Sequence, residues 1–590
     1  MNESKQTIIL GLSCFYHDSA AAILVDGKVI AAAQEERFTR IKHDENFPRN
    51  AVEYCLSFSG FTIKDVDYVV FYDKPITKFE RLLQTYIKVW PRGLRSFIMA
   101  METWLKKKLW IEGTIAKELK FDGKILFTEH HYSHAANAYY CSDFDEATII
   151  TVDGVGEWDT TTIGHGKGGE LKLEKSISFP HSLGLLYSAL TYYLGFKVNS
   201  AEYKVMGLAP YGNPNEYYDK FKELIEIKED GGYHLNMKYF SYEYGQTMTN
   251  KNFDKLFGAP PRNPESELTQ RDKDIASALQ KITEEVMLKI VKYAHSLYPT
   301  QNLCIAGGVA LNCVANGKIL KHGPFKNVYI QPASGDAGGA IGAACLVYYD
   351  MLGNKKESSA TDTIYLGPQF SDQTIKDFLD SKELDIKYKF LGDKETPSIL
   401  AKLISENYVI GLFQGRMEFG PRALGNRSII ADARNKENWQ RVNLKIKFRE
   451  SFRPFAPSIL EEQAEKYFDL GGQTSPYMLM VAKANTQDLP AVTHVDNSAR
   501  IQTINQRQNK KFYDIIKEFE KLTGCPAVIN TSFNVRGEPI VCTPKDAFNT
   551  FLNTDMDYLV LGNYLVSKAD NPKLKILRNT NEYLTTFVLD

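Results

Sequence analysis

Two histidines, His130 and His134, stand four residues apart. On a helix this spacing places both imidazoles on one face, where they can hold one divalent ion. The pair alone is weak, because most such histidines are ordinary surface or core residues, and two ligands do not complete a site. Asp153 follows an apolar strand pattern, and Asp336 lies in a glycine-rich loop before an Ala/Gly-rich helix. Two His with one or two Asp suit iron, manganese or zinc better than calcium, so we predict a transition-metal site.

Two glycine-rich loops have the form expected of phosphate-binding loops. Gly307 and Gly308 follow the apolar run 303–306, and the helix predicted after them carries Asn312 in its first turn. Residues 334–339 form a second loop of this kind. Glycines let the backbone approach a phosphate, and a helix N-terminus favours anions. Together with the candidate metal ligands, the two loops predict a nucleotide cleft.

Cationic side chains gather in three segments of the second half, at residues 415–427, 443–455 and 530–539. Guanidinium groups suit a small oxyanion or a polyphosphate. A charge run is usually a solvated face, but these cations alternate with Gly, Pro and Phe, which favours a walled pocket. If the chain is extended here, Lys447 and Arg449 point to the same face.

The elements that must position these groups form a repeated pattern. An apolar run at 8–12 precedes two more, 20–25 and 28–33, which flank Asp26-Gly27 and predict a hairpin. A further strand is predicted at 67–72. The plan returns at 147–152, followed by Asp153-Gly154 and a glycine-rich stretch, which indicates an internal duplication.

The rest of the chain divides into helices, a linker and a second α/β region. We predict helices at 182–194 and 272–297, and the polar stretch 353–362 predicts a domain boundary near residue 360. Later strands are predicted at 408–413, 428–431 and 526–529. Residues 76–120 have Lys, Arg, Leu and Trp at helical spacing. We interpret them as an amphipathic helical insertion packed on the core and assign them no chemistry; a membrane or partner surface is the alternative.

Bulk composition narrows the class of protein. A length of 590 residues suits two to four domains, and a net charge of -1 gives no basic surplus for nucleic acid. Eight cysteines form no CxxC pair, which favours reduced thiols and a cytoplasmic location. We expect no signal peptide, no membrane span and no membrane partner. A homodimer is compatible with the sequence but is not readable from it.

Taken together, the motifs resemble the carbamoyltransferase family of antibiotic, toxin and nodulation-factor pathways. The resemblance covers most of the chain, and its segments are jointly specific although each alone is weak. The matching segments are HDSAAAILVDGKVIAAAQEERFTRIKH, EHHYSHAANAYY, VDGVGEWDTTT, AEYKVMGLAPYG, GGVALNCVANG, PASGDAGGAIGAA, GRMEFGPRALGNRSII, KFRESFRPFAPSI and NTSFNVRGEPIV.

The resemblance implies a fold and a residue set. It implies a duplicated actin-like or sugar-kinase-like α/β domain at 1–360 and a YrdC-like α/β domain at 361–590. The pair Lys447-x-Arg449 with Ser532-x-Asn534 resembles the signature of the latter. By motif match the metal ligands are His130, His134, Asp153 and Asp336. Carbamoyl phosphate is expected at Arg422, Lys447, Arg453, Arg500, Asn534 and Arg536. Arg507 is the alternative to Arg500. Nucleotide is expected at Lys204, Gly307, Gly308, Asn312, Arg449 and Ser532.

The activity implied is ATP-dependent O-carbamoyl transfer. The second domain is expected to make carbamoyl adenylate from carbamoyl phosphate and ATP with Mg²⁺, and the first to pass the carbamoyl group to a small-molecule hydroxyl. The resemblance implies iron at the metal site; manganese or zinc also fits the ligands. His17, beside Asp18 in a loop after a strand, is our candidate general base, with a hydrogen-bonded core histidine as the alternative.

Two other functions remain open from the sequence. One is transfer of threonylcarbamoyl to tRNA, which the near-zero net charge disfavours. The other is a non-catalytic actin-like nucleotide-binding module, which candidates at every catalytic position disfavour. The acceptor cannot be read from the sequence.

Overall fold

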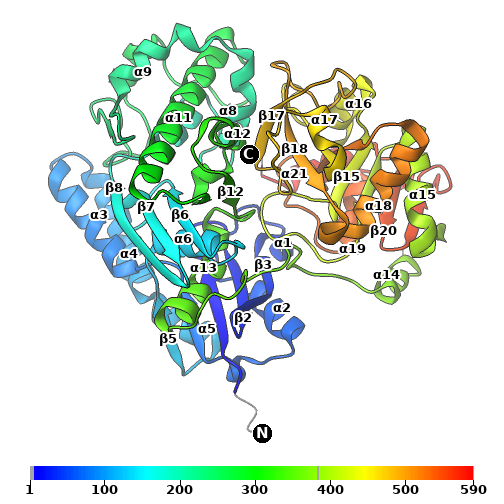
Figure 1. Ribbon diagram of the computed structural model, residues 1–590, viewed down its shortest axis with the longest axis horizontal. Helices are drawn as coiled ribbons and strands as arrows, with labels where there is room; N and C mark the ends of the chain where they lie inside the picture. The colour runs from blue at the N-terminus through cyan, green and yellow to red at the C-terminus, as the bar shows by residue number, and fades with distance from the viewer. Residues whose placement is uncertain (1–4, 382–384, 589–590) are drawn as a thin grey trace. The chain divides into compact units, whose positions relative to one another are not determined.

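The computed structural model describes residues 5–381 and 385–588. The chain forms two compact units (Figure 1). The first comprises Met1–Glu35 and His43–Asp362, and the second comprises Glu36–Lys42 and Thr363–Asp590. Within the described residues, no helix is both long and apolar enough to cross a membrane.

The first unit opens with a five-stranded sheet of order β3-β2-β1-β4-β5. Its strands are β1 (Ile8–Ser13), β2 (Ala20–Val25), β3 (Lys28–Gln34), β4 (Tyr68–Phe71) and β5 (Lys124–Phe127). The first three are antiparallel, and β4 and β5 add in parallel beside β1. Strands β1 and β2 are buried along their whole length, so both faces of the sheet are covered here. The hairpin predicted around Asp26-Gly27 is confirmed.

A second sheet repeats this plan with order β12-β11-β6-β7-β8. Its strands are β6 (Glu146–Val152), β7 (Asp159–Lys167), β8 (Glu170–Ser178), β11 (Asn302–Ala306) and β12 (Asn327–Ile330). Again three antiparallel strands come first, and two parallel strands extend the sheet from β6. The repeated order confirms the internal duplication and the actin-like α/β fold predicted for this half of the chain.

Two helices lie between the sheets. Helix α6 (His130–Tyr139) packs on β6, β7 and β11, α13 (Gly339–Cys345) packs on β1, β2 and β4, and the two helices contact each other. A Cβ at Gly342 would stand 1.8 Å from the backbone oxygen of Ser133. Small residues in α13 are therefore required by the close approach of its backbone to α6.

The insertion between β4 and β5 is helical, as predicted, and appears in blue in Figure 1. It contains α3 (Pro75–Val89), α4 (Leu94–Lys106) and α5 (Ile111–Leu119). Trp104 of α4 is buried, and its ring centroid lies 5.6 Å from that of Phe79. The insertion thus packs through an aromatic contact between its first two helices.

The remaining helices of the first unit begin at recognisable caps. Ser182 accepts a hydrogen bond from the amide of Leu185 at the start of α7 (Leu183–Tyr193), and Thr269 caps α11 (Gln270–Leu297). Both helices were predicted within a few residues. The other elements are α2 (Arg49–Ser59), α8 (Glu202–Leu208), α9 (Tyr218–Leu224), β9 (Ile225–Ile227), β10 (Tyr233–Leu235), α10 (Lys251–Phe257) and α12 (Cys313–His322).

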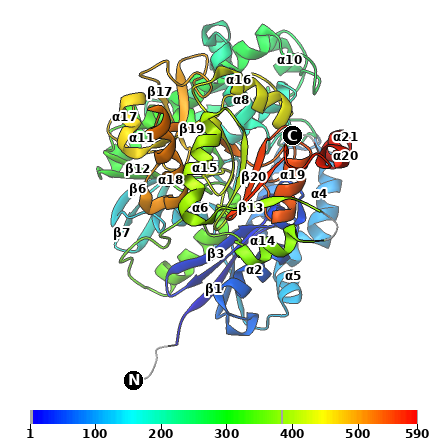
Figure 2. The same ribbon diagram turned by 90° about the vertical axis from the view of Figure 1, so that its right-hand side faces the viewer.

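The second unit is built on a nine-stranded mixed sheet of order β13-β21-β20-β14-β15-β19-β16-β18-β17. Helix α18 packs on β16, β18 and β19, and α19 packs on β14 and β20 (Figure 2). The strands are β13 (Tyr388–Phe390), β14 (Ile410–Phe413), β15 (Arg427–Asp432), β16 (Ala456–Leu460), β17 (Met480–Lys483), β18 (Ser498–Ile504), β19 (Ala527–Ser532), β20 (Tyr558–Leu561) and β21 (Tyr564–Ser567). The helices are α14 (Asp372–Leu379), α15 (Gly392–Ser405), α16 (Lys436–Arg441), α17 (Ala464–Tyr467), α18 (Gln506–Thr523), α19 (Pro544–Leu552), α20 (Leu574–Leu577) and α21 (Thr580–Thr585).

A short N-terminal segment belongs to this second unit. It carries α1 (Glu36–Thr39), and Arg40 donates hydrogen bonds to Glu538 Oε1 at 2.9 Å and to the carbonyl oxygens of Pro539 and Ile540 at 2.8 and 2.7 Å. Phe38 packs against an apolar cluster that includes Met417. This assignment was not predicted, because a segment that follows the strands of one domain carries no local sequence signal that it packs in another.

One local expectation is wrong. Lys447 and Arg449 do not lie on an extended strand: residues 442–446 form a short helix, and Lys447 continues it with φ -85° and ψ -19°. The two side chains are therefore not placed on one face by strand alternation. The amide of Lys447 donates to the carbonyl of Val442 at 2.8 Å and closes the last turn of this helix.

Candidate active site

The four predicted metal ligands of the first unit converge on one point. His130, His134, Asp153 and Asp336 each offer a ligand atom, and these atoms all lie within 4.8 Å of one another. The Nε2 atoms of His130 and His134 are 3.0 Å apart. Asp153 Oδ2 lies 3.0 Å from His130 Nε2, and Asp336 Oδ1 lies 3.6 Å from His134 Nε2.

The duplicated fold explains why these residues meet. His130 and His134 stand in the first turns of α6, which follows β5, and Asp336 stands just before α13, which follows β12. The last strands of the two sheets thus lead into equivalent helices. Asp153 occupies the loop after β6, and His17 the equivalent loop after β1. These residues thus follow the ends of β1, β5, β6 and β12. In α/β folds, ligands commonly bind beyond the ends of the strands.

The donor set fits a single transition-metal ion. Metal–ligand bonds of about 2.1 Å place neighbouring ligand atoms about 3 to 3.5 Å apart, close to the separations found here. Two imidazole nitrogens and two carboxylate oxygens suit iron, manganese or zinc. All four residues are buried, so a cation would also neutralise two carboxylates in a poorly solvated place.

The charges of the cluster are strongly coupled. Burial tends to raise the pKa of Asp153, but hydrogen bonds and charge from His130 and His134 hold it well below its usual range. Burial tends to lower the pKa of His134, but Asp153 and Asp336 outweigh it and raise the pKa to about 9. Without a metal, a proton on His134 therefore supplies positive charge beside the two carboxylates.

His17 lies directly beside the ligand cluster. Its Nε2 is 3.4 Å from Asp336 Oδ2, and its Nδ1 is 3.0 Å from Asp18 Oδ2. The other oxygen of Asp18 lies 2.7 Å from His43 Nδ1. Burial tends to lower the pKa of His17, but Asp336 and Asp18 raise it to about 10. Asp18 thus orients the imidazole from one side, and the metal-site carboxylate faces it from the other.

Four buried residues near this site were missed by the sequence analysis. The hydroxyl of Tyr72 donates to Asp336 Oδ2 at 3.1 Å. Asp73 Oδ2 pairs with Lys78 and lies 3.8 Å from His130 Nδ1. Glu157 accepts hydrogen bonds from the backbone amide of His130, with both carboxylate oxygens at 3.1 Å.

The position of Asp73 offers a signal that could have found it. It follows the apolar run that became β4, as Asp153 follows the run that became β6. Burial, with a further contribution from Asp73, raises the pKa of Glu157 to about 7. Asp73 and Glu157 therefore form an acidic pair that lies against the ligand His130.

The predicted nucleotide residues of the first unit are partly assembled. The amide of Gly308 donates to Asp153 Oδ1 at 2.8 Å, and Gly307 adopts φ +93°, which favours glycine. The Asn312 side chain caps α12 and exchanges two amide hydrogen bonds with Gln280, at 3.0 and 3.1 Å. Lys204, on α8, is fully buried. The glycine loop therefore joins the metal cluster, whereas the Asn312 amide is occupied within the fold.

A second set of predicted residues meets in the second unit around Lys447. Its ammonium group donates to the carbonyl oxygens of Ser532 and Asn534 at 2.7 and 2.8 Å, and to the Ser532 hydroxyl at 3.2 Å. Burial, with repulsion from Arg449 and Arg453, holds the pKa of Lys447 well below its usual range. The Lys-x-Arg and Ser-x-Asn motifs, 85 residues apart at Lys447 and Ser532, are thus in direct contact.

Arginines extend this cationic cluster. Arg453 and Arg536 both face Glu450, with N–O distances of 3.6 and 3.7 Å. Arg449 donates to Asn443 Oδ1 at 2.7 Å, and its guanidinium lies 4.6 Å from the ring centroid of Phe455. Phe455 thus lies against the cluster.

The two remaining predicted arginines are both half-buried in the second unit. Arg422 is half-buried in the loop before β15, and Arg500 is half-buried on β18. Arg507, the alternative to Arg500, is exposed near the start of α18. Exposure of Arg507 favours Arg500 as the pocket residue of the two.

Comparison with known proteins gives matches over most of the chain. The model for the carbamoyltransferase N-terminus matches residues 8–345, and the model for the carbamoyltransferase C-terminus matches residues 401–568. An uncharacterized protein of Synechocystis sp. is 52% identical over 96% of this chain and 98% of its own length. Nodulation protein NolNO of Sinorhizobium fredii is 38% identical over 94% of this chain and 79% of its own.

Solved structures give weaker similarity. Component A of (R)-2-hydroxyglutaryl-CoA dehydratase from Acidaminococcus fermentans is 14% identical, with a TM-score of 0.30, and covers 58% of this chain and 98% of its own. HypF of T. kodakarensis is also 14% identical, with a TM-score of 0.31, and covers 59% of this chain and 48% of its own. These scores are too low to bear on function.

The family match extends through both units, and it contains His17, the four converging ligands and the Lys447 cluster. The chain belongs to the carbamoyltransferase family and is an enzyme of that class.

Proposed function

We propose that this enzyme is an ATP-dependent O-carbamoyltransferase with two separate reaction sites. Residues 361–590, joined by the segment 36–42, form the adenylation domain, and the rest of 1–360 forms the transfer domain. The second domain is proposed to be YrdC-like. The observation that carries the proposal is the convergence of His17 and four ligand atoms on one point of the first unit.

The first reaction is assigned to the Lys447 cluster. Carbamoyl phosphate loses its phosphate to water and leaves carbamate, whose oxygen attacks the α-phosphorus of ATP. Pyrophosphate leaves and carbamoyl adenylate forms. Carbamate alone is a poor donor because its leaving group would be oxide, whereas adenylate has a good leaving group. Arg422, Arg453, Arg500 and Arg536 bind the phosphate and stabilise the departing charge; Mg²⁺ accompanies ATP.

The Lys447 ammonium organises this site rather than acting as a mobile base. It holds the Ser532–Asn534 turn through four hydrogen bonds of 2.5 to 3.2 Å. Burial favours its neutral form, so a bound anion would restore the favourable charged state. Binding of an oxyanion at this cluster is therefore supported by electrostatics as well as by motif.

The second reaction is assigned to the metal cluster and His17. The acceptor hydroxyl adds to the carbamoyl carbon, the bond to AMP breaks, and the hydroxyl proton passes to His17 Nε2. His17 must be neutral to accept this proton; a cation held by Asp336 would offset the carboxylate charge that raises the pKa of His17. Asp18, 3.0 Å from His17 Nδ1, holds the ring in orientation. A metal bound by His130, His134, Asp153 and Asp336 would supply Lewis acidity; iron is the proposed ion, and manganese and zinc also fit. Gly307 and Gly308 line the adenylate phosphate, with Lys204 and Asn312 as further proposed contacts.

The acceptor is proposed to be a small natural-product hydroxyl. Relatives named as nodulation proteins, such as NolNO, support an acceptor from a biosynthetic pathway. A reducing, cytoplasmic setting is also proposed, because all eight cysteines are free and buried. Neither proposal depends on the identity of the metal.

The test is pyrophosphate release from ATP with and without carbamoyl phosphate, in the absence of acceptor. We expect release that requires carbamoyl phosphate, and we expect it to persist after the metal of the first unit is removed by a chelator and Mg²⁺ is restored. Release that ignores carbamoyl phosphate, or none with folded protein, would count against the proposed chemistry.

A further inference from the structure

The helical insertion of the first unit exposes an unusual amount of apolar surface. Of the 20 exposed large hydrophobic side chains among the described residues, eight lie between Ile76 and Trp110. Scattered exposed apolar residues need no explanation, but such a concentration marks an interaction surface. The interpretation of this segment as an amphipathic insertion packed on the core therefore accounts for its buried side, and its exposed apolar side chains require a further explanation.

On α4 three of these side chains, together with the half-buried Met101, form one stripe, and the exposed Met99 lies outside it. Leu94, Ile98, Met101 and Leu105 follow each other at spacings of four, three and four residues, which places them on one side of a helix. Leu94, Ile98 and Leu105 are 48%, 60% and 55% exposed. We call these four residues the α4 stripe.

A tryptophan stands beyond each end of the α4 stripe. Trp90 and Trp110 are each 65% exposed. The indole nitrogen of Trp110 donates to the Leu105 carbonyl at 2.8 Å, which fixes this ring beside the last residue of the stripe. Tryptophan favours the boundary between apolar and aqueous phases, because its ring is apolar and its N–H is polar.

The surroundings of the stripe are strongly basic. Residues 88–110 contain six Lys or Arg and one acidic residue, Glu102, although the whole chain has a net charge of -1. Glu102 is itself paired with Lys106 at 2.7 Å. Lys88, Arg92, Arg95, Lys106 and Lys107 are exposed.

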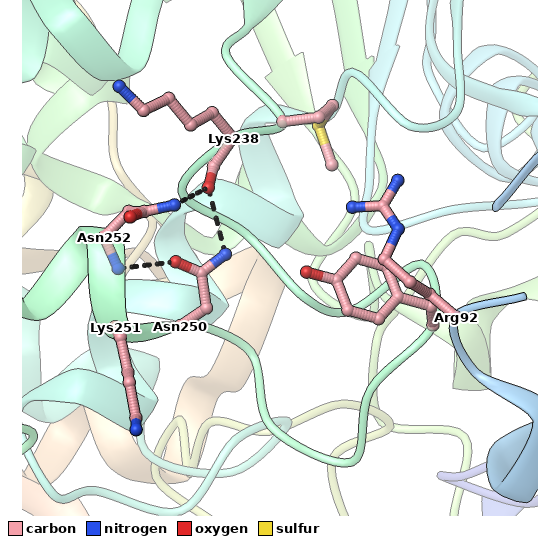
Figure 3. A pocket seen from close by; sticks show the side chains of 7 residues that line it. Arg92, Lys238, Asn250, Lys251 and Asn252 are labelled. Carbon is pink, nitrogen blue, oxygen red and sulfur yellow. Dashed lines mark hydrogen bonds between the residues drawn. The ribbon is translucent and has the colours of Figure 1, made fainter.

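A pocket lined by Arg92 adjoins the N-terminal end of α4. It has a volume of about 520 Å³; Lys238 and Lys251 also line it, with side chains that extend away from Arg92 (Figure 3). The other lining residues are Met237, Tyr244, Asn250 and Asn252, so none is acidic. The amides of Asn250 and Asn252 both donate to the Lys238 carbonyl, at 3.0 and 3.1 Å, and fix the loop that carries the lysine.

Contacts at its wall tie this pocket to the α4 stripe. The guanidinium of Arg92 lies 4.9 Å from the ring centroid of Tyr244. Two residues beyond Leu94, the Ser96 hydroxyl donates to the Tyr244 carbonyl at 2.9 Å. An anionic group in the pocket would therefore lie close to the start of the apolar stripe.

We propose that the α4 stripe, its two tryptophans and the Arg92 pocket form a docking surface for an anionic phospholipid membrane. The apolar side chains enter the acyl boundary, the tryptophans lie at headgroup level, and the cations bind lipid phosphates. Such binding lies along the surface and requires no membrane-spanning helix. It departs from the expectation of no membrane partner, which rested on the absence of a long apolar run, and it does not depend on the proposed function.

Charge decides between a membrane and a second copy of this chain. Two copies meeting through this surface would bring five exposed basic residues against five. The acidic residues on each side are Glu102 and the half-buried Glu243, which interacts with Lys88 and Arg92. Like charges in apposition oppose association, whereas an anionic bilayer complements them.

The test is sedimentation of the full chain with vesicles of phosphatidylcholine, with and without phosphatidylglycerol. We expect binding only to the vesicles that contain phosphatidylglycerol, a decline with rising ionic strength, and a blue shift of tryptophan fluorescence. Leu94→Ser/Ile98→Ser and, separately, Arg92→Gln/Lys238→Gln should each weaken partitioning on the order of tenfold.

Matched controls separate these effects from general ones. Val495→Ser/Leu522→Ser removes apolar groups of similar exposure from the second unit, and Lys172→Gln/Lys222→Gln removes two exposed charges from other parts of the first. Both should bind vesicles like the parent chain. Absent binding, equal binding to both vesicles, or equal loss in the controls would overturn the proposal. A dimer that Leu94→Ser/Ile98→Ser dissociates, without vesicle binding, would overturn it in favour of a second copy.

Discussion

His17 and Asp336 face each other across 3.4 Å, from His17 Nε2 to Asp336 Oδ2, while the other oxygen of Asp336 faces His134 at 3.6 Å. One carboxylate therefore contacts the proposed base with one oxygen and the proposed metal site with the other. Because Asp336 contacts both the proposed base and the proposed metal site, each variant requires separate measurements of metal binding, adenylate formation and carbamoyl transfer.

His134→Ala should remove the metal from the first unit. The imidazole supplies one of four converging ligand atoms, and a three-ligand remnant with two buried carboxylates binds metal far less tightly. Metal content by mass spectrometry should fall from about one ion per chain to under about a tenth, since loss of a direct ligand exceeds the 10- to 100-fold effect of outer residues. The control is His165→Ala. His165 lies on β7 and pairs with Glu146 of β6, away from the metal ligands. Unchanged metal content in His134→Ala would refute the site.

His17→Ala should separate activation from transfer. We expect carbamoyl transfer to fall by about 10²- to 10⁴-fold, because a positioned general base is lost. Pyrophosphate release, measured without acceptor, should stay at the parental level. The metal content should also be unchanged. Normal transfer by this variant would remove His17 as the base, and loss of metal would make it a ligand instead.

Asp73→Asn should weaken metal binding without removing a ligand. Asp73 Oδ2 lies 3.8 Å from His130 Nδ1, and that nitrogen has no hydrogen-bond partner among the described residues. A small rotation of the ring would make the contact that commonly orients a metal-bound histidine, and losing it costs about 10- to 100-fold in affinity. Titration with a competing chelator measures this, with Glu80→Gln on α3 as control. Equal affinities would show that Asp73 serves Lys78 alone.

Lys447→Ala should abolish pyrophosphate release and leave the metal content intact. The ammonium group holds the turn that carries Ser532 and Asn534, so its loss frees two motif residues. Lys445→Ala, two residues away and exposed, should release pyrophosphate at the parental rate. If both variants remain active, the adenylation site must lie elsewhere.

Lys568 provides a pH test of the second unit. Burial, with repulsion from Arg578, lowers the pKa of Lys568 to about 7. Its ordinary value of 10.5 applies when unfolded, so between these pH values unfolding takes up a proton and the contribution of this residue to stability rises with pH. The melting temperature of the parent should therefore rise relative to that of Lys568→Met between pH 7 and 10. A constant difference would place the true pKa near its ordinary value.

Local patterns in the sequence determined much of the first unit. The Asp26-Gly27 hairpin, the strand before Asp153 and the capped helix beginning at Gln270 all lie within a few residues of their predicted positions. These features depend on short-range chemistry: turn residues, apolar runs and side-chain caps act within a few positions. The metal ligands could be proposed for the same reason, since His130 and His134 share one helix face by spacing alone.

Tertiary structure decided what separation in sequence conceals. His130 and Asp336 meet only because the two repeats place equivalent helices side by side, and Arg40 joins Glu538 across almost 500 residues. The helical turn at Lys447 replaced the expected extended conformation. It could not be predicted, because Lys447 contacts Ser532 and Asn534, which are distant in the sequence. Spacing determines which side chains share one element; only packing decides which elements meet, because that outcome minimises the free energy of the whole chain rather than of any segment.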